Sequence, residues 1–421
     1  MPHSSIWLIC YRSKSVLKTA FGAMSTTSGI KGIALLGAGI FAKEAHLPAL
    51  AALGTSAPPL FAVYSRSRSS AQNLADAAKE TLSYLNAPPD VFYDVNAATG
   101  ITNEKTGLDA LLARPDISAV IVVLPITLQP EIVRKVLKAG KHVLSEKPVA
   151  PDVKSGLEII GEYRKEFQNR GLVWRVAENW EAEPAYRKIG KAIQEGVIGD
   201  VKWFRSSVWN FVDASSKWYK TPWRTVPEHT AAMLRGMLPV QPTHLTGFAA
   251  LNKAILAPHD TIHSVLKAVG KDKDGKETTL FTGTSDMTFA SPTESRPPGD
   301  ALVIAGTKGW ISVNTTYQNG NPFIRARTVT RVKKDTKESI SNGEENDEED
   351  HEEITETPGK GVQVELQAFF AAVDNVTQGQ DAADNLGDPS HALWDVAFIE
   401  AALKSDGRLV DFGKLLSTGQ V

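Results

Sequence analysis

The chain has 421 residues and a mass of 45.5 kDa, which is long enough for two domains with separate hydrophobic cores. A formal net charge of -2 and a pI near 6.5 give no electrostatic reason to expect a nucleic-acid partner. No apolar stretch approaches the roughly twenty residues that a membrane span needs. Cys10 is the only cysteine, which excludes an intrachain disulfide and a cysteine metal site. We therefore expect a reducing compartment, the cytoplasm, and no metal, nucleic-acid or membrane partner.

Residues 1–29 differ in composition from the rest of the chain. They contain three basic residues and no acidic one. Two interpretations remain open: a disordered extension in front of a start at Met24, or a mitochondrial presequence. The second would make the protein mitochondrial instead of cytoplasmic.

Residues 30–150 alternate between strand and helix patterns, which predicts an α/β domain with a doubly wound parallel sheet. One segment of it is almost entirely apolar, as is typical of a strand buried on both faces. The predicted elements are the strand Ile33–Leu36, the helix Phe41–Ala52, the strand Leu60–Tyr64, the helix Ser69–Lys79, the apolar strand Ile117–Leu124, the helix Pro130–Ala139 and the strand His142–Ser145.

The pattern changes after a helix that Asp152 could cap and that runs to about Phe167. Consecutive strands without helices between them predict an α+β domain over 151–413, built on an open, mostly antiparallel sheet. The predicted elements are Leu172–Ala177 (strand), Ala185–Gln194 (helix), the strands Val201–Val212, Thr261–Ala268, Leu280–Phe289, Ala301–Ile304, Trp310–Asn314 and Phe323–Val332, and the helices Val362–Val376 and His391–Lys404. The segment 335–361 is strongly acidic and is expected to be a disordered loop.

A glycine-rich turn follows the first predicted strand. Gly37-Ala38-Gly39-Ile40-Phe41-Ala42 is a G-x-G-x-x-A sequence, in which missing side chains let backbone N–H groups and a helix N-terminus approach a pyrophosphate. Ala42 allows the helix to pack against the strand. The turn predicts a dinucleotide site at Gly37, Gly39, Ile40, Phe41 and Ala42.

The end of the second predicted strand bears on the choice of dinucleotide. An NAD site usually has an acidic residue there, which takes the ribose 2′-hydroxyl. This chain has Ser65 and Arg66, which suit a 2′-phosphate through charge-assisted hydrogen bonds. We expect NADP to be preferred over NAD, with an exposed basic loop as the other interpretation.

Glu146-Lys147-Pro148 follows the last predicted strand of the first domain. Ligands of doubly wound sheets bind at the carboxyl ends of the strands. There the Lys147 ammonium could donate to a substrate oxygen and stabilise negative charge during hydride transfer. The proline makes a cis Lys147–Pro148 bond plausible.

From Lys31 to Gly413 the chain resembles the Gfo/Idh/MocA family. The matching segments are the glycine turn, Leu124-Pro125, Glu146-Lys147-Pro148, Glu178-Asn179-Trp180, Gly196–Gly199, Trp223-Arg224 and Gly306–Gly309. The resemblance implies a Rossmann domain followed by an open-sheet domain that binds substrate and forms a homodimer. It also implies oxidation or reduction of sugars, inositols or related polyols with NAD or NADP. It adds Leu124, Pro125 and Glu146 to the cofactor site and assigns Asn179, Trp223 and Arg224 to the substrate.

The chain departs from this family after Trp223-Arg224. Family enzymes carry there a glycine-rich segment with an aspartate and then a histidine, the acid/base beside the lysine. Here Ala231-Ala232 replace glycines, Gly236 stands where the aspartate is expected, and no histidine has the right spacing. The stretch also looks too short for the usual helix.

Three interpretations follow from this departure. His229 or His244 acts as a substitute acid/base, or the segment is a mis-spliced piece of an ordinary enzyme, or the protein is a non-catalytic nucleotide-binding regulator like the galactose repressors of this family. We expect an NAD(P)-dependent oxidoreductase acting on CH–OH groups. His46 is expected to pack or cap, and Trp394 and Asp395 to pack back on the first domain.

Overall fold

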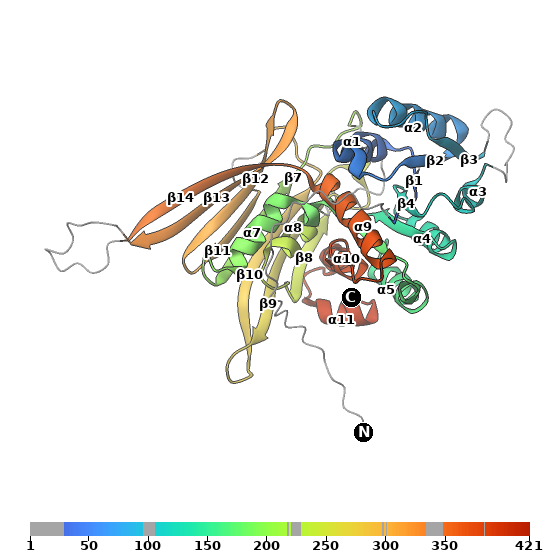
Figure 1. Cartoon of the computed structure of the whole chain (residues 1–421). Coiled ribbons are helices and arrows are strands. Elements are labelled where there is room, and N and C mark those ends of the chain that lie inside the picture. Colours follow the sequence, from blue (N-terminus) through green and yellow to red (C-terminus); the bar gives the residue numbers. More distant parts are fainter. Residues whose placement is uncertain are drawn as a thin grey trace, which may run out of the picture.

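The computed structural model describes residues 29–95, 106–216, 219, 229–296, 299, 301–333, 348–382 and 384–421. Two sheets organise these residues, one of six strands and one of nine (Figure 1). Residues 1–28, 221–228 and 334–347 lie outside the described part, and with them most of the predicted presequence. Within the described ranges, none of the helices is long and apolar enough to cross a membrane.

The first sheet is parallel throughout and has the strand order β3-β2-β1-β4-β5-β6. Its strands are β1 (Ile33–Leu36), β2 (Leu60–Ser67), β3 (Asp90–Val95), β4 (Ala119–Val122), β5 (His142–Glu146) and β6 (Trp174–Ala177). The helices around it are α1 (Leu47–Leu53), α2 (Arg68–Thr81), α3 (Leu108–Leu112), α4 (Gln129–Lys138) and α5 (Val153–Glu162). The strand order reverses between β1 and β4, which is the switch point where such sheets bind ligands. The predicted Rossmann architecture is confirmed, and Asp152 caps α5 by accepting from the Ser155 N–H (2.8 Å).

The first sheet extends past residue 150, contrary to the predicted boundary. The predicted strand Leu172–Ala177 belongs to it as β6, which pairs with β5. The Trp174 side chain is fully buried and its Nε1 donates to Ser145 Oγ of β5 (3.0 Å). An apolar strand of a parallel sheet is buried by helices on its faces, and the helices Gly361–Thr377 and Pro389–Lys404 both contact this strand.

The second sheet is antiparallel except for the parallel pair β7 and β10. Its order is β14-β13-β12-β11-β7-β10-β9-β8-β15. The strands are β7 (Val201–Trp209), β8 (His244–Ala250), β9 (Thr261–Lys271), β10 (Glu277–Thr288), β11 (Leu302–Gly306), β12 (Gly309–Gln318), β13 (Asn321–Lys333), β14 (Glu348–Pro358) and β15 (Val410–Asp411). The predicted open, mostly antiparallel sheet is confirmed.

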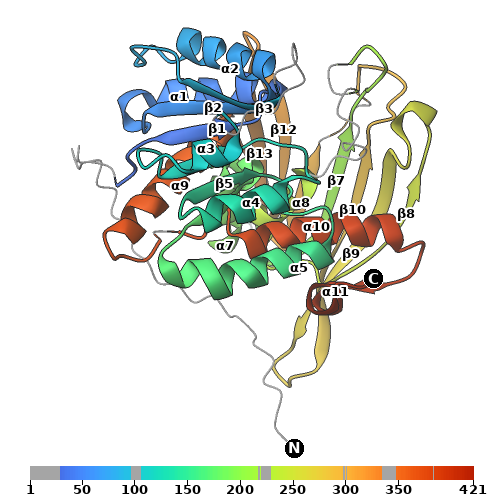
Figure 2. The ribbon, with the colours of Figure 1, turned by 90° about the vertical axis from the view of Figure 1, so that its right-hand side faces the viewer.

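Six more helices connect and cover the sheets. They are α6 (Asn179–Ala182), α7 (Pro184–Gln194), α8 (His229–Met237), α9 (Gly361–Thr377), α10 (Pro389–Lys404) and α11 (Phe412–Thr418). In Figure 1, α7 and α8 lie in front of the second sheet, and α10 contacts both β8 of that sheet and β6 of the first. Figure 2 shows α9 returning to the first sheet, where Leu366, Phe369 and Val373 share a core with Ile33 and Leu144. The helices α9 and α10 thus connect the two sheets.

The acidic segment is not a loop over its whole predicted range. Glu348–Pro358 forms β14, which pairs with β13. The strand is held by opposite charges: Arg327 Nη2 lies 2.8 Å from Glu352 Oε2, and Arg331 Nε lies 3.4 Å from Glu348 Oε2. Composition alone suggested disorder, but a basic neighbouring strand compensates the carboxylates.

Candidate active site

The turn after β1 has a backbone that only glycine tolerates. Gly37 has φ +104°, and a Cβ on it would lie 2.0 Å from the Val123 carbonyl oxygen. Its N–H donates to the Tyr64 carbonyl of β2 (2.8 Å), which holds the turn over the sheet. A Cβ on Gly39, by contrast, would meet nothing within 4 Å. The backbone at Gly37 therefore requires glycine, whereas a side chain at Gly39 would extend into unoccupied space.

This turn forms one wall of a cavity of about 460 Å³ at the carboxyl ends of β1, β2, β4 and β5. That volume is in the range of small-molecule and cofactor sites. The cavity is lined by Gly37, Ala38, Gly39, Ile40, Phe41, Ser65, Arg66, Ser67, Ser70, Val123, Leu124, Pro125, Ile126, Leu128, Glu146, Lys147 and Pro148. Every predicted cofactor residue except Ala42 is in this group. Ala42 is buried in the core beneath the turn, the packing position that the motif predicts.

The wall at the end of β2 is basic and rich in hydroxyl groups. Ser65, Arg66, Ser67 and Ser70 line it, and the Ser67 Oγ accepts from the Ser70 N–H (3.3 Å) at the start of α2. None of these residues is acidic. The wall therefore offers donors, and no carboxylate acceptor, to a group bound beside it.

Glu146 and Lys147 connect the cavity to a buried cluster of ionisable groups. Glu146 lines the cavity, and its Oε1 lies 2.7 Å from Nε2 of His46, which is fully buried. Glu365 of α9 completes the cluster: one ligand-type atom from each of the three residues lies within 4.8 Å of the others. The Lys147–Pro148 peptide bond is cis.

His46 and Glu365 are the parts of this cluster that the motifs missed or misjudged. His46 was expected to pack or cap, and it does pack edge-on against Phe41 (5.5 Å between centroids), but it also binds Glu146. Glu365 lies on the buried face of α9, together with Leu366 and Phe369. A carboxylate in the apolar stripe of a core helix was the signal that the sequence offered.

His244, one of the two predicted substitutes for the acid/base, lies away from the cavity. It begins β8, where its Nδ1 lies 2.9 Å from Thr243 Oγ1 and its Nε2 lies 3.9 Å from Asp411 Oδ2. Because β8 pairs with β15 at one edge of the second sheet, the histidine is held at that edge. The structure therefore does not bring His244 to the cavity wall, and its acid/base role remains a prediction.

Of the other predicted residues, the structure describes the side chain of Asn179 alone. Asn179 begins α6, where its carbonyl oxygen packs against Gly361, and it does not line the cavity. His229 begins α8, but its side chain lies outside the described residues, as do Trp223 and Arg224. Their predicted roles remain predictions.

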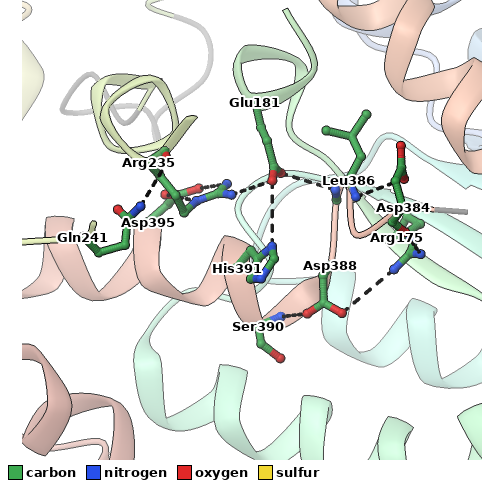
Figure 3. A network of polar contacts seen from close by, with 11 residues as sticks. Arg175, Glu181, Arg235, Gln241, Asp384, Leu386, Asp388, Ser390, His391 and Asp395 are labelled. Carbon is green, nitrogen blue, oxygen red and sulfur yellow. Dashed lines mark hydrogen bonds and ion pairs between the residues drawn. The ribbon is translucent and has the colours of Figure 1, made fainter. Parts of the chain in front are cut away.

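The segment that departs from the family forms a helix held by a buried ion network (Figure 3). Arg235 of α8 places Nη1 2.7 Å from Glu181 Oε1 and Nη2 2.8 Å from Asp395 Oδ2, and its Nε donates to Asp395 Oδ1 (3.0 Å). Burial alone would raise the pKa of Glu181, but the charges and hydrogen bonds of Arg235 and His391 lower it to about 2. The Asp395 side chain thus binds α8 of the second domain, while its helix α10 also contacts α5 and β6 of the first domain, as predicted. The network ties α6, α8 and α10 together.

The fold and the cavity define a Rossmann-type dinucleotide-binding protein. Comparison with known proteins agrees: residues 31–168 match the GFO_IDH_MocA model, described as an oxidoreductase family with an NAD-binding Rossmann fold. Dehydrogenase FPY6 of Fusarium mangiferae is 32% identical over 388 residues, which are 89% of this chain and 96% of that protein. The chain belongs to this family and is an NAD(P)-dependent oxidoreductase acting on CH–OH groups.

Solved structures share the whole architecture. An oxidoreductase from Thermotoga maritima is 26% identical and superposes with a TM-score of 0.65, covering 91% of this chain and 99% of that one. A levoglucosan dehydrogenase in complex with NADH and levoglucosan is 17% identical, with a TM-score of 0.63 and coverages of 90% and 99%. The oxidoreductase relatives favour an enzyme over the non-catalytic regulator considered from the sequence.

Proposed function

We propose that this enzyme transfers hydride between NADP, in preference to NAD, and a sugar, inositol or related polyol. The observation that carries the proposal is the continuous cavity wall from Gly37 through Ser65 and Arg66 to Lys147. The glycine turn fits a pyrophosphate, because no Cβ stands between its backbone and the cavity at Gly39. Bound there, the dinucleotide supplies or accepts the hydride.

The basic wall at the end of β2 supports the preference for NADP. A 2′-phosphate needs donors, and Ser65 and Arg66 provide a hydroxyl and a guanidinium on the cavity surface. A ribose 2′-hydroxyl is usually held by a carboxylate, and this wall has none among Ser65, Arg66, Ser67 and Ser70.

Lys147 is the group we assign to the reacting oxygen. Lys147 lines the cavity directly after the end of β5, and its ammonium can donate to a hydroxyl or carbonyl oxygen of the substrate. Donation stabilises the negative charge that develops on this oxygen as hydride leaves or arrives at the adjacent carbon. The levoglucosan dehydrogenase that shares the fold supports a sugar-type substrate.

The cofactor preference is tested by fluorescence titration with NADPH and NADH. In Arg66→Asp, NADPH affinity falls by about 10- to 150-fold, because a charge-assisted bond worth about 1.5–3 kcal/mol is lost. NADH affinity changes less. Arg68→Asp is the matched control, since Arg68 starts α2 and stacks near Tyr93 (6.0 Å) without lining the cavity. Equal affinities of the unmodified protein for both cofactors would contradict the assignment.

The substrate class is tested with NADP and NADPH against glucose, xylose, levoglucosan, myo-inositol and their keto forms. Turnover of at least one supports the class, and it should disappear in Lys147→Met while NADPH still binds. No turnover of any of them by a protein that binds NADPH would refute the sugar and polyol assignment.

We also propose a homodimer formed through the second sheet. Trp203, Phe248 and Val265 are exposed on β7, β8 and β9, and their strand neighbours Phe204 and Leu266 point the other way into the core. These apolar side chains share the face with polar ones such as Arg205 and Lys267, and a mixed face of this kind is suited to a second copy. Light scattering should give twice the chain mass, and Val265→Glu should give a monomer.

The single cysteine, Cys10, supports a cytoplasmic location.

A further inference from the structure

Behind Lys147 lies the buried cluster of His46, Glu146 and Glu365, which no motif of the sequence explains. We propose that Glu365 exchanges the catalytic proton with Lys147, and that the hydrogen-bonded pair of His46 and Glu146 positions Glu365 for this exchange. The proposal rests on the assignment of Lys147 to the reacting oxygen. It makes Glu365 a residue that acts through Lys147, without touching the substrate.

Glu146 provides the structural link between the cavity and Glu365. It lines the cavity beside Lys147 and also binds His46 Nε2 at 2.7 Å. The three side chains keep one nitrogen or oxygen atom each within 4.8 Å of one another. They come from three segments, because His46 follows the glycine turn, Glu146 ends β5 and Glu365 lies in α9. Their polar atoms are thus neighbours in the buried cluster, although within the described residues Glu365 makes no hydrogen bond to the other two.

Glu365 is the member of the cluster that is built to bind a proton. It is 4% exposed, and within the described structure neither of its carboxyl oxygens has a hydrogen-bond partner. Ionising such a carboxyl group costs several kcal/mol. Burial and the negative charges of Glu146 and Glu178 raise its pKa well above the ordinary value, while the positive charge of Lys147 lowers it. Its protonation therefore depends on that of Lys147.

Most other charged groups on the elements packed against α9 bind partners other than Glu365. Arg175 of β6 donates to the Asp384 carbonyl (2.8 Å), and Glu181 of α6 binds Arg235. Glu183 accepts from the N–H groups of Lys360 and Gly361 at the start of α9. The remaining ones are Lys43, which is half-buried, and Glu44, which is exposed. α1 carries no titratable side chain. Glu146, Glu178 and Lys147 are therefore the groups that set the charge state of Glu365.

The proton balance of the reaction then closes within this chain. In oxidation, one N–H bond of the Lys147 ammonium breaks, and the proton forms an O–H bond on ionised Glu365. The substrate O–H bond then breaks, and its proton forms an N–H bond at the neutral Lys147 Nζ, which restores the ammonium. The hydride passes from the substrate carbon to the nicotinamide. Reduction runs the same steps in reverse, with protonated Glu365 as the donor.

The test measures protonation directly and needs no substrate. Infrared spectra of the full-length protein, recorded across pH, should show a protonated carboxyl band that persists well above the ordinary range of a glutamate. The Glu365 component of the band should disappear in Glu365→Gln and remain in Glu183→Gln. Glu183 is a matched buried carboxyl group outside the cluster, and burial raises its pKa as well. In Lys147→Met the titration of the band should move to higher pH, because the positive charge that lowers the pKa is gone.

The second readout is Lys147 itself, followed by NMR of labelled lysine and assigned by its loss in Lys147→Met. Its titration should shift in Glu365→Gln and stay in place in Glu183→Gln. The proposal would be overturned by a carboxyl band that titrates at the ordinary pKa of a glutamate. It would also be overturned if the titration of Lys147 were the same in Glu365→Gln and in the unmodified protein. A tightly bound stoichiometric metal in the purified protein would overturn it too, since a cation would then occupy the place of the proton.

Activity separates this proposal from the proposed function. With a sugar that the unmodified protein converts, Glu365→Gln should lower kcat by about 10²-fold and leave KM and NADPH affinity unchanged. Reduction should decline, and oxidation should rise, as pH increases through the raised pKa of Glu365. A coupled carboxyl band in a protein that converts no sugar refutes the substrate class alone. Sugar turnover that Glu365→Gln does not change refutes the proton exchange alone.

Discussion

Removing Arg235 should destabilise the protein by several kcal/mol. Its side chain is 7% exposed and makes contacts of 2.7 to 3.0 Å to two carboxylates, Glu181 and Asp395. In Arg235→Ala both carboxylates stay buried without their cation, and breaking a buried pair in this way costs about 3–5 kcal/mol. An independent value comes from the pKa of Glu181. It falls from 4.5 to about 2, and that shift corresponds to about 3 kcal/mol of stability.

The sign of this contribution sets the pH window. The folded-state pKa of Glu181 is below its ordinary value, so the contribution of Glu181 is fully present above pH 4.5 and is lost as pH falls toward about 2. Burial raises the pKa of Asp395, which works in the opposite direction and makes the acid decline shallower. Urea unfolding at pH 7 and at a series of acidic pH values measures both effects. Arg235→Ala should lose about 3–5 kcal/mol at pH 7 and show a flatter decline in acid. Arg331→Ala removes an exposed arginine that faces Glu348, and this control should change stability by less than about 1 kcal/mol. A change of that small size in Arg235→Ala would refute the reasoning.

Two further predictions concern the cavity. Gly37→Ala should destabilise by at least about 1–3 kcal/mol and abolish the stabilisation by NADPH in thermal unfolding, because its φ is +104° and the methyl group would meet the Val123 carbonyl. Gly39→Ala should unfold at the normal temperature without cofactor, and equal melting curves for the two variants would contradict the assigned turn geometry. Lys147→Met should lower turnover by about 10²- to 10⁴-fold with NADPH binding retained. His244→Ala should leave turnover unchanged, and a loss of activity in it would return that histidine to the active site.

Elements with a local signal could be predicted from the sequence, and those that depend on a distant partner could not. The strand Ile33–Leu36 and the turn at Gly37 are specified by their own residues, and both are found where expected. The β14 strand depends on Arg327 and Arg331 of β13, a preceding segment of the chain, so its composition alone indicated disorder. Likewise, the residues of Leu172–Ala177 predict a strand but do not indicate which of the two sheets the strand joins.

The same distinction applies to the site. The cofactor wall follows from motifs, because each of its segments ends a strand at one edge of the sheet. The His46–Glu146–Glu365 cluster unites residues up to 319 positions apart, and only the packing of α9 against the first sheet brings them together. The sequence contains one weak indication of Glu365, which is a carboxyl group among the apolar residues of the buried face of α9. No spacing rule connects it to Lys147.

The departure from the family is therefore best understood through what α8 does in this chain. In place of an aspartate and a histidine beside the lysine, the helix offers Arg235, whose guanidinium is fixed by Glu181 and Asp395. An arginine is not deprotonated in proteins, and one held by two carboxylates has no proton to exchange. Arg235 thus ties α8 to α6 and α10, and the side chain of His229 lies outside the described residues. The lysine still needs a partner for its proton, and Glu365 is a buried carboxyl group whose pKa responds to Lys147. An enzyme that uses the cluster behind Lys147 in this way can dispense with the histidine.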